Sequence, residues 1–314
     1  MRGLCRYCAV VLFLLICLCQ RIPDEIALQT HRVRGYGHFQ PQWVSLCPNM
    51  VPANDPFKEV REQPQGIPHE FGNLSVIWID MQIGQHIYHA MKSGAIEKDK
   101  ATSIIKQWNI DTSTVTHEYV DQEISCAIGT SSEGDVVCIP DTDNDENLGD
   151  EKPIIIKRKT IDSLKALHPD VMVMTDNIPY REVFFEYYDG ESIKITRQFI
   201  AVNPSFMYGK DRIPVCSDQF IVNLSTYEFR TASLEIGSDE YTFVCANGFK
   251  PGLYSPINTR IMIDTKGLQE FTTSKEGNQI YGIRDTVNLG KQTFLIEDIS
   301  VDGSVISLKK FIHD

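Results

Sequence analysis

The histidine-bearing segments contain the residue types that acid/base or metal chemistry would need. His86 and His89 lie three residues apart, a spacing that puts two imidazoles on one face of a helix. A zinc site needs a third protein ligand and a supporting second shell. The segments that begin at His69 and at His117 do not complete the two-histidine motif of the zinc peptidases. We therefore predict no metal site and expect these histidines to be surface or partly packed side chains.

The most acidic stretch runs from residue 141 to residue 151 with the sequence DTDNDENLGDE. Its oxygen-bearing side chains at alternate positions are Asp141, Asp143, Asp145 and Asn147. A calcium loop of the EF-hand type fails at Glu146, where its sharp turn needs glycine, and at Lys152, where its bidentate glutamate should stand. Like charges at this density repel one another and bury little, so we predict an exposed acidic linker over residues 141–153, as a domain boundary or as a long exposed loop.

The charge balance and the motif content narrow the function classes. The formal net charge of −12 argues against nucleic acid as a partner, because that binding depends on Lys and Arg that neutralise phosphates. The sequence contains no nucleophile elbow, phosphate-cradling glycine loop or dinucleotide fingerprint. We predict no catalytic residue from a motif and no cofactor. A dispersed acid/base site drawn from His86, His89, His117 and acidic residues needs no local signature, and it stays open.

Residues 69–140 predict a small α/β region. The predicted elements are, in order, a strand over 74–81, helices over 82–92 and 96–108, and strands over 123–129 and 135–140. The first helix should end at Ser93-Gly94, a common C-terminal stop. The two last strands form a hairpin that puts Cys126 and Cys138 on adjacent strands.

Beyond the acidic stretch the hydrophobic pattern changes to period two, which is typical of strands. The predicted strands cover residues 154–156, 171–175, 182–188, 192–202, 220–229, 231–236, 241–246, 260–264, 279–283, 293–299 and 304–312, with a short helix over 160–167. Asp189-Gly190 between two alternating runs predicts a tight hairpin. The fold class is therefore α+β and predominantly β. A small α/β region precedes a β-rich domain over residues 154–314, built as a sandwich or as two small sheet modules.

A faint internal repeat relates residues 188–200 to residues 301–312. Both segments begin around an Asp-Gly pair, Asp189-Gly190 in the first and Asp302-Gly303 in the second. Such a repeat suggests two duplicated β modules, although any two Asp-Gly hairpins look alike.

The N-terminus predicts export. A basic start is followed by an apolar run from Ala9 to Cys19 and an abrupt polar stop, the pattern of a cleavable secretory signal peptide. This run reaches only roughly half of a bilayer core. We therefore expect a signal peptide over residues 1–19, an extended Pro-rich arm over residues 20–68, and a secreted mature chain with no membrane span.

Export would place the cysteines in an oxidising compartment and expose the glycosylation sequons to modification. We predict bridges that join Cys126 to Cys138 and Cys216 to Cys245, with Cys47 left as a free or intermolecular thiol that would permit a disulfide-linked dimer. The pairing is one of fifteen ways in which five cysteines form two bridges.

Two acceptor sequons begin at Asn73 and Asn223. A glycan on Asn223 requires its side chain to face water while Val222 and Leu224 point inward.

Two function classes remain. The leading hypothesis is a secreted glycoprotein that acts by surface binding to another protein or cell-surface component, without catalysis. The alternative is a secreted hydrolase with a dispersed acid/base site. A pocket with converging carboxylates and imidazoles would favour the hydrolase, and a pocket-free sandwich with an exposed apolar patch would favour binding.

Overall fold

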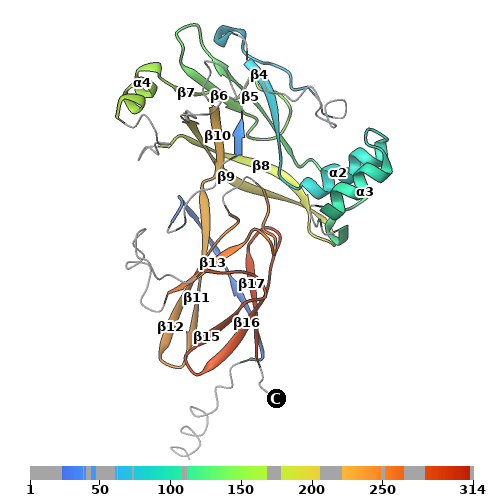
Figure 1. Ribbon diagram of the computed structural model, residues 1–314, viewed down its shortest axis with the longest axis vertical. Coiled ribbons are helices and arrows are strands. Elements are labelled where there is room, and N and C mark those ends of the chain that lie inside the picture. The colour runs from blue at the N-terminus through green and yellow to red at the C-terminus, as the bar shows by residue number, and fades with distance from the viewer. Residues whose placement is uncertain are drawn as a thin grey trace, which may run out of the picture.

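The computed structural model describes residues 23–37, 39, 44–46, 61, 63–72, 74–107, 110, 112–167, 178–205, 221–248, 252–264 and 280–311. Strands predominate over helices, which confirms the α+β, predominantly β class. The strands form four antiparallel sheets that pack in two pairs, one above the other in Figure 1. No helix in these residues is long and apolar enough to cross a membrane.

One pair of sheets forms what we call the inserted module, because its strands β3 to β10 lie in the chain between β2 and β11. Its strands are β3 (Val44–Leu46), β4 (Leu74–Asp80), β5 (Glu123–Thr130), β6 (Val136–Pro140), β7 (Ile154–Ile156), β8 (Tyr180–Tyr188), β9 (Ile193–Ser205) and β10 (Ile221–Thr226). They form sheets of order β4-β5-β6-β7 and β3-β10-β9-β8. Alternate residues of both sheets meet in one core, for example Ile79 of β4 and Phe185 of β8.

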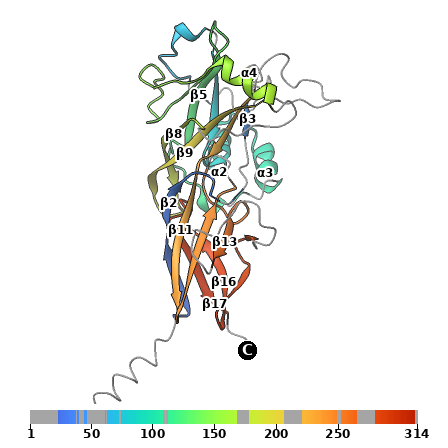
Figure 2. The same ribbon diagram turned by 90° about the vertical axis from the view of Figure 1, so that its left-hand side faces the viewer.

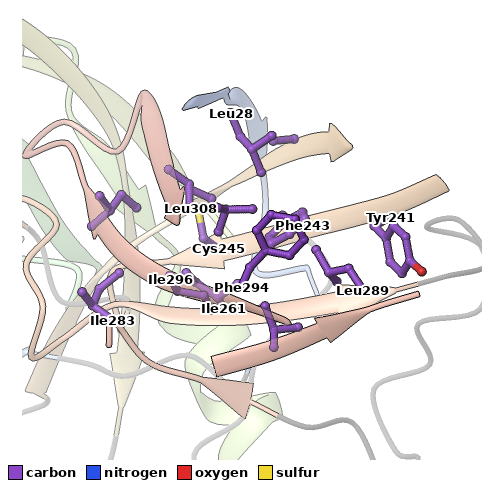
Figure 3. Close-up of a cluster of buried hydrophobic side chains, with 14 of the residues drawn as sticks. Leu28, Tyr241, Phe243, Cys245, Ile261, Ile283, Leu289, Phe294, Ile296 and Leu308 are labelled. Atoms are coloured by element: carbon purple, nitrogen blue, oxygen red, sulfur yellow. The ribbon is translucent and has the colours of Figure 1, made fainter. Parts of the chain in front are cut away.

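The other pair of sheets forms the host module. Its strands are β1 (Glu25–Gln29), β2 (His31–Arg34), β11 (Glu228–Ile236), β12 (Asp239–Ala246), β13 (Arg260–Asp264), β14 (Ile280–Tyr281), β15 (Thr286–Leu289), β16 (Gln292–Ile299) and β17 (Val305–Lys310). The sheet orders are β2-β11-β12-β13-β14 and β1-β17-β16-β15. Figure 3 shows Phe243 and Phe294 of facing sheets in the centre of this core. Full burial of each such ring contributes roughly 1.5–3 kcal/mol.

The two modules repeat one topology. In each, a first strand pairs with the last strand of the module, β3 with β10 and β1 with β17. The next strands form a meander, β4 to β7 in one module and β2 with β11 to β14 in the other, and three final strands form a second meander. The faint sequence repeat does not follow this equivalence. Residues 188–200 lie at the β8–β9 turn, whereas the described part of the second segment, residues 301–311, lies at the β16–β17 turn, one strand further along.

The described residues of the inserted module also include three α-helices: α2 (Ile83–Ser93), α3 (Lys98–Gln107) and α4 (Arg158–Leu167). A short 3-10 turn, η1 (His69–Phe71), precedes β4, and a second one, η2 (Thr112–Thr114), follows α3. Helix α2 ends at Gly94, which adopts the left-handed conformation typical of a C-terminal stop. Ile87 and Ala90 of α2 pack against Ala101 of α3. The two helices form the connection in the chain between β4 and β5, and they lie beside the sheet in the two views of Figures 1 and 2.

Two segments differ from the predicted organisation. The arm predicted over residues 20–68 supplies β1, β2 and β3 to three different sheets. The acidic linker predicted over residues 141–153 joins β6 to β7, which are adjacent strands of one sheet. Its Leu148 is fully buried against that sheet, and Asp141 is buried as well, whereas Asp143, Asp145 and Asp150 are exposed. The chain passes between the modules twice instead, between β2 and β3 and again at Tyr227 between β10 and β11.

Buried polar contacts fasten the modules together. Gln198 of β9 makes two hydrogen bonds with the Gly252 backbone of the host module, one to its carbonyl oxygen at 2.9 Å and one from its N–H at 3.0 Å. Arg32 of β2 reaches Glu182 of β8 at 3.0 Å and Glu228 at 2.6 Å. The backbone N–H of Phe199 also donates to Glu228.

Candidate functional site

The outer face of the sheet β4-β5-β6-β7 is divided into an apolar half and a polar half. Ala127, Val137 and Ile139 lie on the apolar half, under Leu148 and Phe71. Toward the other end of the same strands the side chains become polar and aromatic. This polar half forms the floor of a cleft.

The cleft has a volume of about 450 Å³, within the range of small-ligand sites. Sheet, helix α2, the segment before β5 and the acidic loop all contribute to it. Its lining residues are Trp78, His86, His89, Lys92, Ser93, His117, Tyr119, Val120, Asp121, Gln122, Glu123, Ser125, Asp141, Asn144 and Glu146. Carboxylates and imidazoles therefore converge in one place, and Lys92 supplies the one permanent cation among these lining residues.

Strand alternation explains the floor. Glu123 and Ser125 are two residues apart on β5, and Asp121 continues the same spacing just before the strand. Trp78 is the cross-strand partner of Ser125 on β4, and Asp80 is the partner of Glu123. These residues share one face of the sheet, opposite the face that packs into the core.

A buried ionic cluster closes one end of the floor. The Arg61 guanidinium lies 3.2 Å from Asp80 and 3.5 Å from Glu123, with its carbon above the Trp78 ring at 5.4 Å. His86 Nδ1 contacts Glu123 and lies 3.4 Å from Asp80.

Burial raises the pKa of Asp80 to about 6, against the lowering effect of His86 and Arg61. Burial also opposes ionisation of Glu123, but hydrogen bonds from His86 and Asp80 lower its pKa overall. The pKa values of the two carboxyls therefore differ: Glu123 is the ionised partner, and Asp80 is the one that retains a proton more readily.

Asp121 is crowded by other carboxylates. Burial raises its pKa to about 6, and the negative charges of Glu186, Asp141 and Glu123 raise it further, while a hydrogen bond with Asn144 lowers it. Burial also raises the pKa of Asp141 above its usual range. Asp141 accepts hydrogen bonds from the backbone N–H groups of residues 145 and 146 at 3.2 and 2.9 Å, which fold the acidic loop back toward the cleft.

The wall that α2 provides is held by amide clamps. Gln85 accepts a hydrogen bond from the N–H of Thr116 at 2.9 Å and donates one to its carbonyl at 2.9 Å. Gln82 makes the same reciprocal pair with the backbone of Tyr188, at 3.0 and 2.9 Å. These contacts fix the start of the helix against the segment before β5 and against β8.

The imidazoles are already engaged. His89 Nε2 lies 2.7 Å from the carbonyl oxygen of Glu118. The nitrogens of His117 lie 2.5 and 3.1 Å from the Tyr88 hydroxyl. His86 is only 6% exposed, so the prediction of a surface or partly packed residue is wrong for it: α2 packs this side chain against the beginning of β5.

No activated nucleophile is assembled among the residues that line the cleft. Ser125 donates to Asp141 at 3.3 Å and not to a histidine, so no base is positioned to take its proton. His86 Nδ1 faces Glu123, as in a catalytic dyad, but its Nε2 is buried from solvent and from the cleft. A general base must reach the proton that it removes, and this ring does not.

Among the residues that the structure describes, two groups have ligand types that suit a metal ion. Asp80, His86 and Glu123 offer atoms within 4.8 Å of one another, but the Arg61 guanidinium already supplies positive charge to both carboxylates. Asp141, Asp143 and Asp145 form the second group, and Asp141 there is used by backbone N–H groups of its own loop.

The predicted cysteine pairs are partly within the described residues. Cys126 and Cys138 lie on adjacent strands as expected, and their sulfur atoms are 3.3 Å apart as two buried thiols. Burial raises the pKa of the third described thiol, Cys245, to about 12. Cys216 and Cys47 lie outside the described residues, as does the predicted signal peptide.

Of the two predicted glycosylation sequons, only the one at Asn223 lies in the described residues. Asn73 lies outside the described residues. Asn223 is 2% exposed, so the prediction that its side chain faces water is wrong. The reason is a second layer over β10: the Tyr36 hydroxyl hydrogen-bonds Ser225, two residues further along the same face, at 2.6 Å.

Comparison with protein families, with curated proteins and with solved structures found no match in any of the three.

Proposed function

We propose that this protein is a secreted binding protein that recognises a positively charged group of another macromolecule in the cleft formed by β4, β5, α2 and the acidic loop. The observation that carries the proposal is the crowding of Asp121 by Glu123 and Asp141, which also line the cleft, and by Glu186, whose carboxylate accepts a hydrogen bond from the Asp121 N–H at 3.1 Å. A cation placed there would relieve the mutual repulsion of these carboxylates, which is the physical basis for affinity.

The rest of the chain agrees with this assignment. The net charge of −12 attracts basic partners over a distance set by the salt concentration. The lining also includes Trp78 and Tyr119, whose rings can carry a cation on their faces. Both amide clamps hold α2 in place, so the cleft is formed before any ligand arrives.

Titration with butylammonium chloride, followed by backbone amide NMR shifts, tests the proposal, with 1-butanol as the uncharged probe. We expect saturable shifts at Asp121, Glu123 and Ser125 with the cation alone. Asp121→Asn should abolish them, and the same change at the exposed Asp99 of α3 should not. Equal responses to both probes, or an unchanged titration in Asp121→Asn, would remove the basis for the proposal.

A hydrolase is the second candidate, because carboxylates and imidazoles do converge in the cleft. Its supporting geometry is the contact between Glu123 and His86 Nδ1, in which a carboxylate orients an imidazole. The buried Nε2 of His86 weighs against it. Screening the purified protein with chromogenic ester, glycoside and peptide substrates decides the matter: turnover that disappears in both Glu123→Gln and His86→Gln would favour the enzyme over the binding protein.

A further inference from the structure

The cleft floor presents two carboxylates at the spacing of alternate strand residues. Asp121 and Glu123 are two residues apart, roughly 6.6 Å along an extended chain. An ammonium is a compact charge whose three donors are not arranged in a plane. A guanidinium is a planar fork with donors on two edges, and it can serve two carboxylates at once.

The cleft also offers flat aromatic surfaces beside these carboxylates. Trp78 lies in its lining. Tyr119 is 68% exposed, and its ring is parallel to that of His89, with an angle of 10° and centroids 6.0 Å apart. A planar cation gains stacking contacts on such surfaces that a tetrahedral ammonium does not.

The protein uses the same arrangement twice for its own arginines. Arg32 lies over the Phe199 ring at 4.7 Å while its guanidinium contacts Glu182 and Glu228.

Arg61 lies over the Trp78 ring at 5.4 Å while it contacts Asp80 and Glu123. In both places two carboxylates from different strands hold one guanidinium against an aromatic face. Asp121 and Glu123 line the same cleft as Tyr119, so two carboxylates and an aromatic ring occur together there as well.

We infer that the natural occupant of the cleft is an arginine side chain presented by a protein partner, an inference that rests on the proposed function. The volume of about 450 Å³ accommodates one long side chain with part of its neighbouring backbone. A metal ion is the poorer fit to Asp80, His86 and Glu123, because the Arg61 guanidinium already contacts both carboxylates of that group.

Calorimetric titration of the full chain with three peptides tests the inference: acetyl-Gly-Arg-Gly-amide, its lysine analogue and its citrulline analogue. Citrulline keeps the shape of arginine and removes the charge. We expect the arginine peptide to bind about fivefold more tightly than the lysine peptide, the equivalent of one further hydrogen bond of ordinary strength, and the citrulline peptide to bind least.

The outcomes separate the two proposals. Equal affinity for the arginine and lysine peptides, both above citrulline, overturns the inference and leaves the proposed function standing. Affinities that do not depend on charge overturn both.

A separate variant tests whether an aromatic ring contributes to the preference for arginine. Tyr119→Leu should weaken the arginine peptide about threefold and affect the lysine peptide less. Phe184→Leu, an equivalent change at a half-exposed ring on β8, is the control and should leave both affinities unchanged. An arginine affinity that is the same in Tyr119→Leu as in the unmodified chain overturns the preference for a stacked planar cation.

Discussion

Glu123 and Glu228 occupy equivalent places in the two modules. Each is the first residue of the strand that follows the first strand of its meander, β5 in one module and β11 in the other. Each carboxylate contacts an arginine, at 3.5 Å for Arg61 and at 2.6 Å for Arg32. Glu228 is 2% exposed and closed in by the module junction, whereas Glu123 borders the cleft. One topological position is thus structural in the host module and open to a ligand in the inserted module.

Loss of the Glu228 charge should destabilise the fold strongly. Glu228→Gln leaves the partly buried Arg32 without its closest anion, and breaking a buried pair in this way costs about 3 kcal/mol. Glu182→Gln removes the more exposed partner of the same arginine and should cost less than about 1 kcal/mol. Urea unfolding at equilibrium measures both variants. Equal losses would mean that burial at the junction does not set the strength of this pair.

Asp121 should make the folded state less stable as the pH rises. Its pKa is raised to about 6, mainly by burial and then by Glu186, Asp141 and Glu123, so the folded chain keeps a proton that the unfolded chain has already lost. The penalty is absent near pH 4, grows between about pH 4 and pH 6, and is complete above that range.

Asp121→Asn should therefore stabilise the protein by about 1 kcal/mol at pH 7, after allowance for solvent screening of a half-exposed group, and leave stability near pH 4 unchanged. Thermal or urea unfolding at the two pH values provides the comparison, with Asp99→Asn as control. A gain of the same size at both pH values would show that the cause is not the titration of Asp121.

Cys126 and Cys138 are close enough to form a bridge under oxidising conditions, with their sulfur atoms 3.3 Å apart. The hydrogen bond with Cys138 and burial raise the pKa of the Cys126 thiol, and both side chains are fully buried, so neither should react with alkylating agents while the chain is folded. A bridge across this short hairpin would add about 3 kcal/mol. Peptide mapping without reductant should yield the two segments linked. Complete alkylation of both thiols in denaturant alone would contradict the pairing.

The amide clamp between Gln198 and Gly252 should be the main polar fastening between the modules. Gln198→Ala leaves a buried N–H and a buried carbonyl with one partner fewer, which costs about 2 kcal/mol. Thr196→Ala, on the same strand and partly exposed, should change stability by less than about 0.5 kcal/mol. Hydrogen exchange at the Gly252 amide should accelerate in the first variant only. Exchange at the same rate in both variants would exclude the clamp as a fastening.

Sequence reasoning located the elements whose local patterns are strong. The apolar run at residues 74–81 became β4, and the stop at Gly94 ended α2. It missed β1 and β2 because their few residues form strands only through pairing with β17 and β11, which lie almost 200 residues or more away. Such pairing leaves no periodic signal in a short segment.

The site was less accessible to sequence reasoning than the fold. The alternation of Asp121, Glu123 and Ser125 can be seen in the sequence, but it marks a site only once β4 supplies Trp78 opposite Ser125. The burial of His86 depends on the path by which α2 returns over β5. Both facts arise from tertiary packing and not from local residue preference.

A crystal structure of the protein with acetyl-Gly-Arg-Gly-amide at saturating concentration tests the central claim most directly. The account predicts the guanidinium between the Asp121 and Glu123 carboxylates, against an aromatic face of the cleft. A saturated peptide seated anywhere else, with the cleft empty, would contradict it.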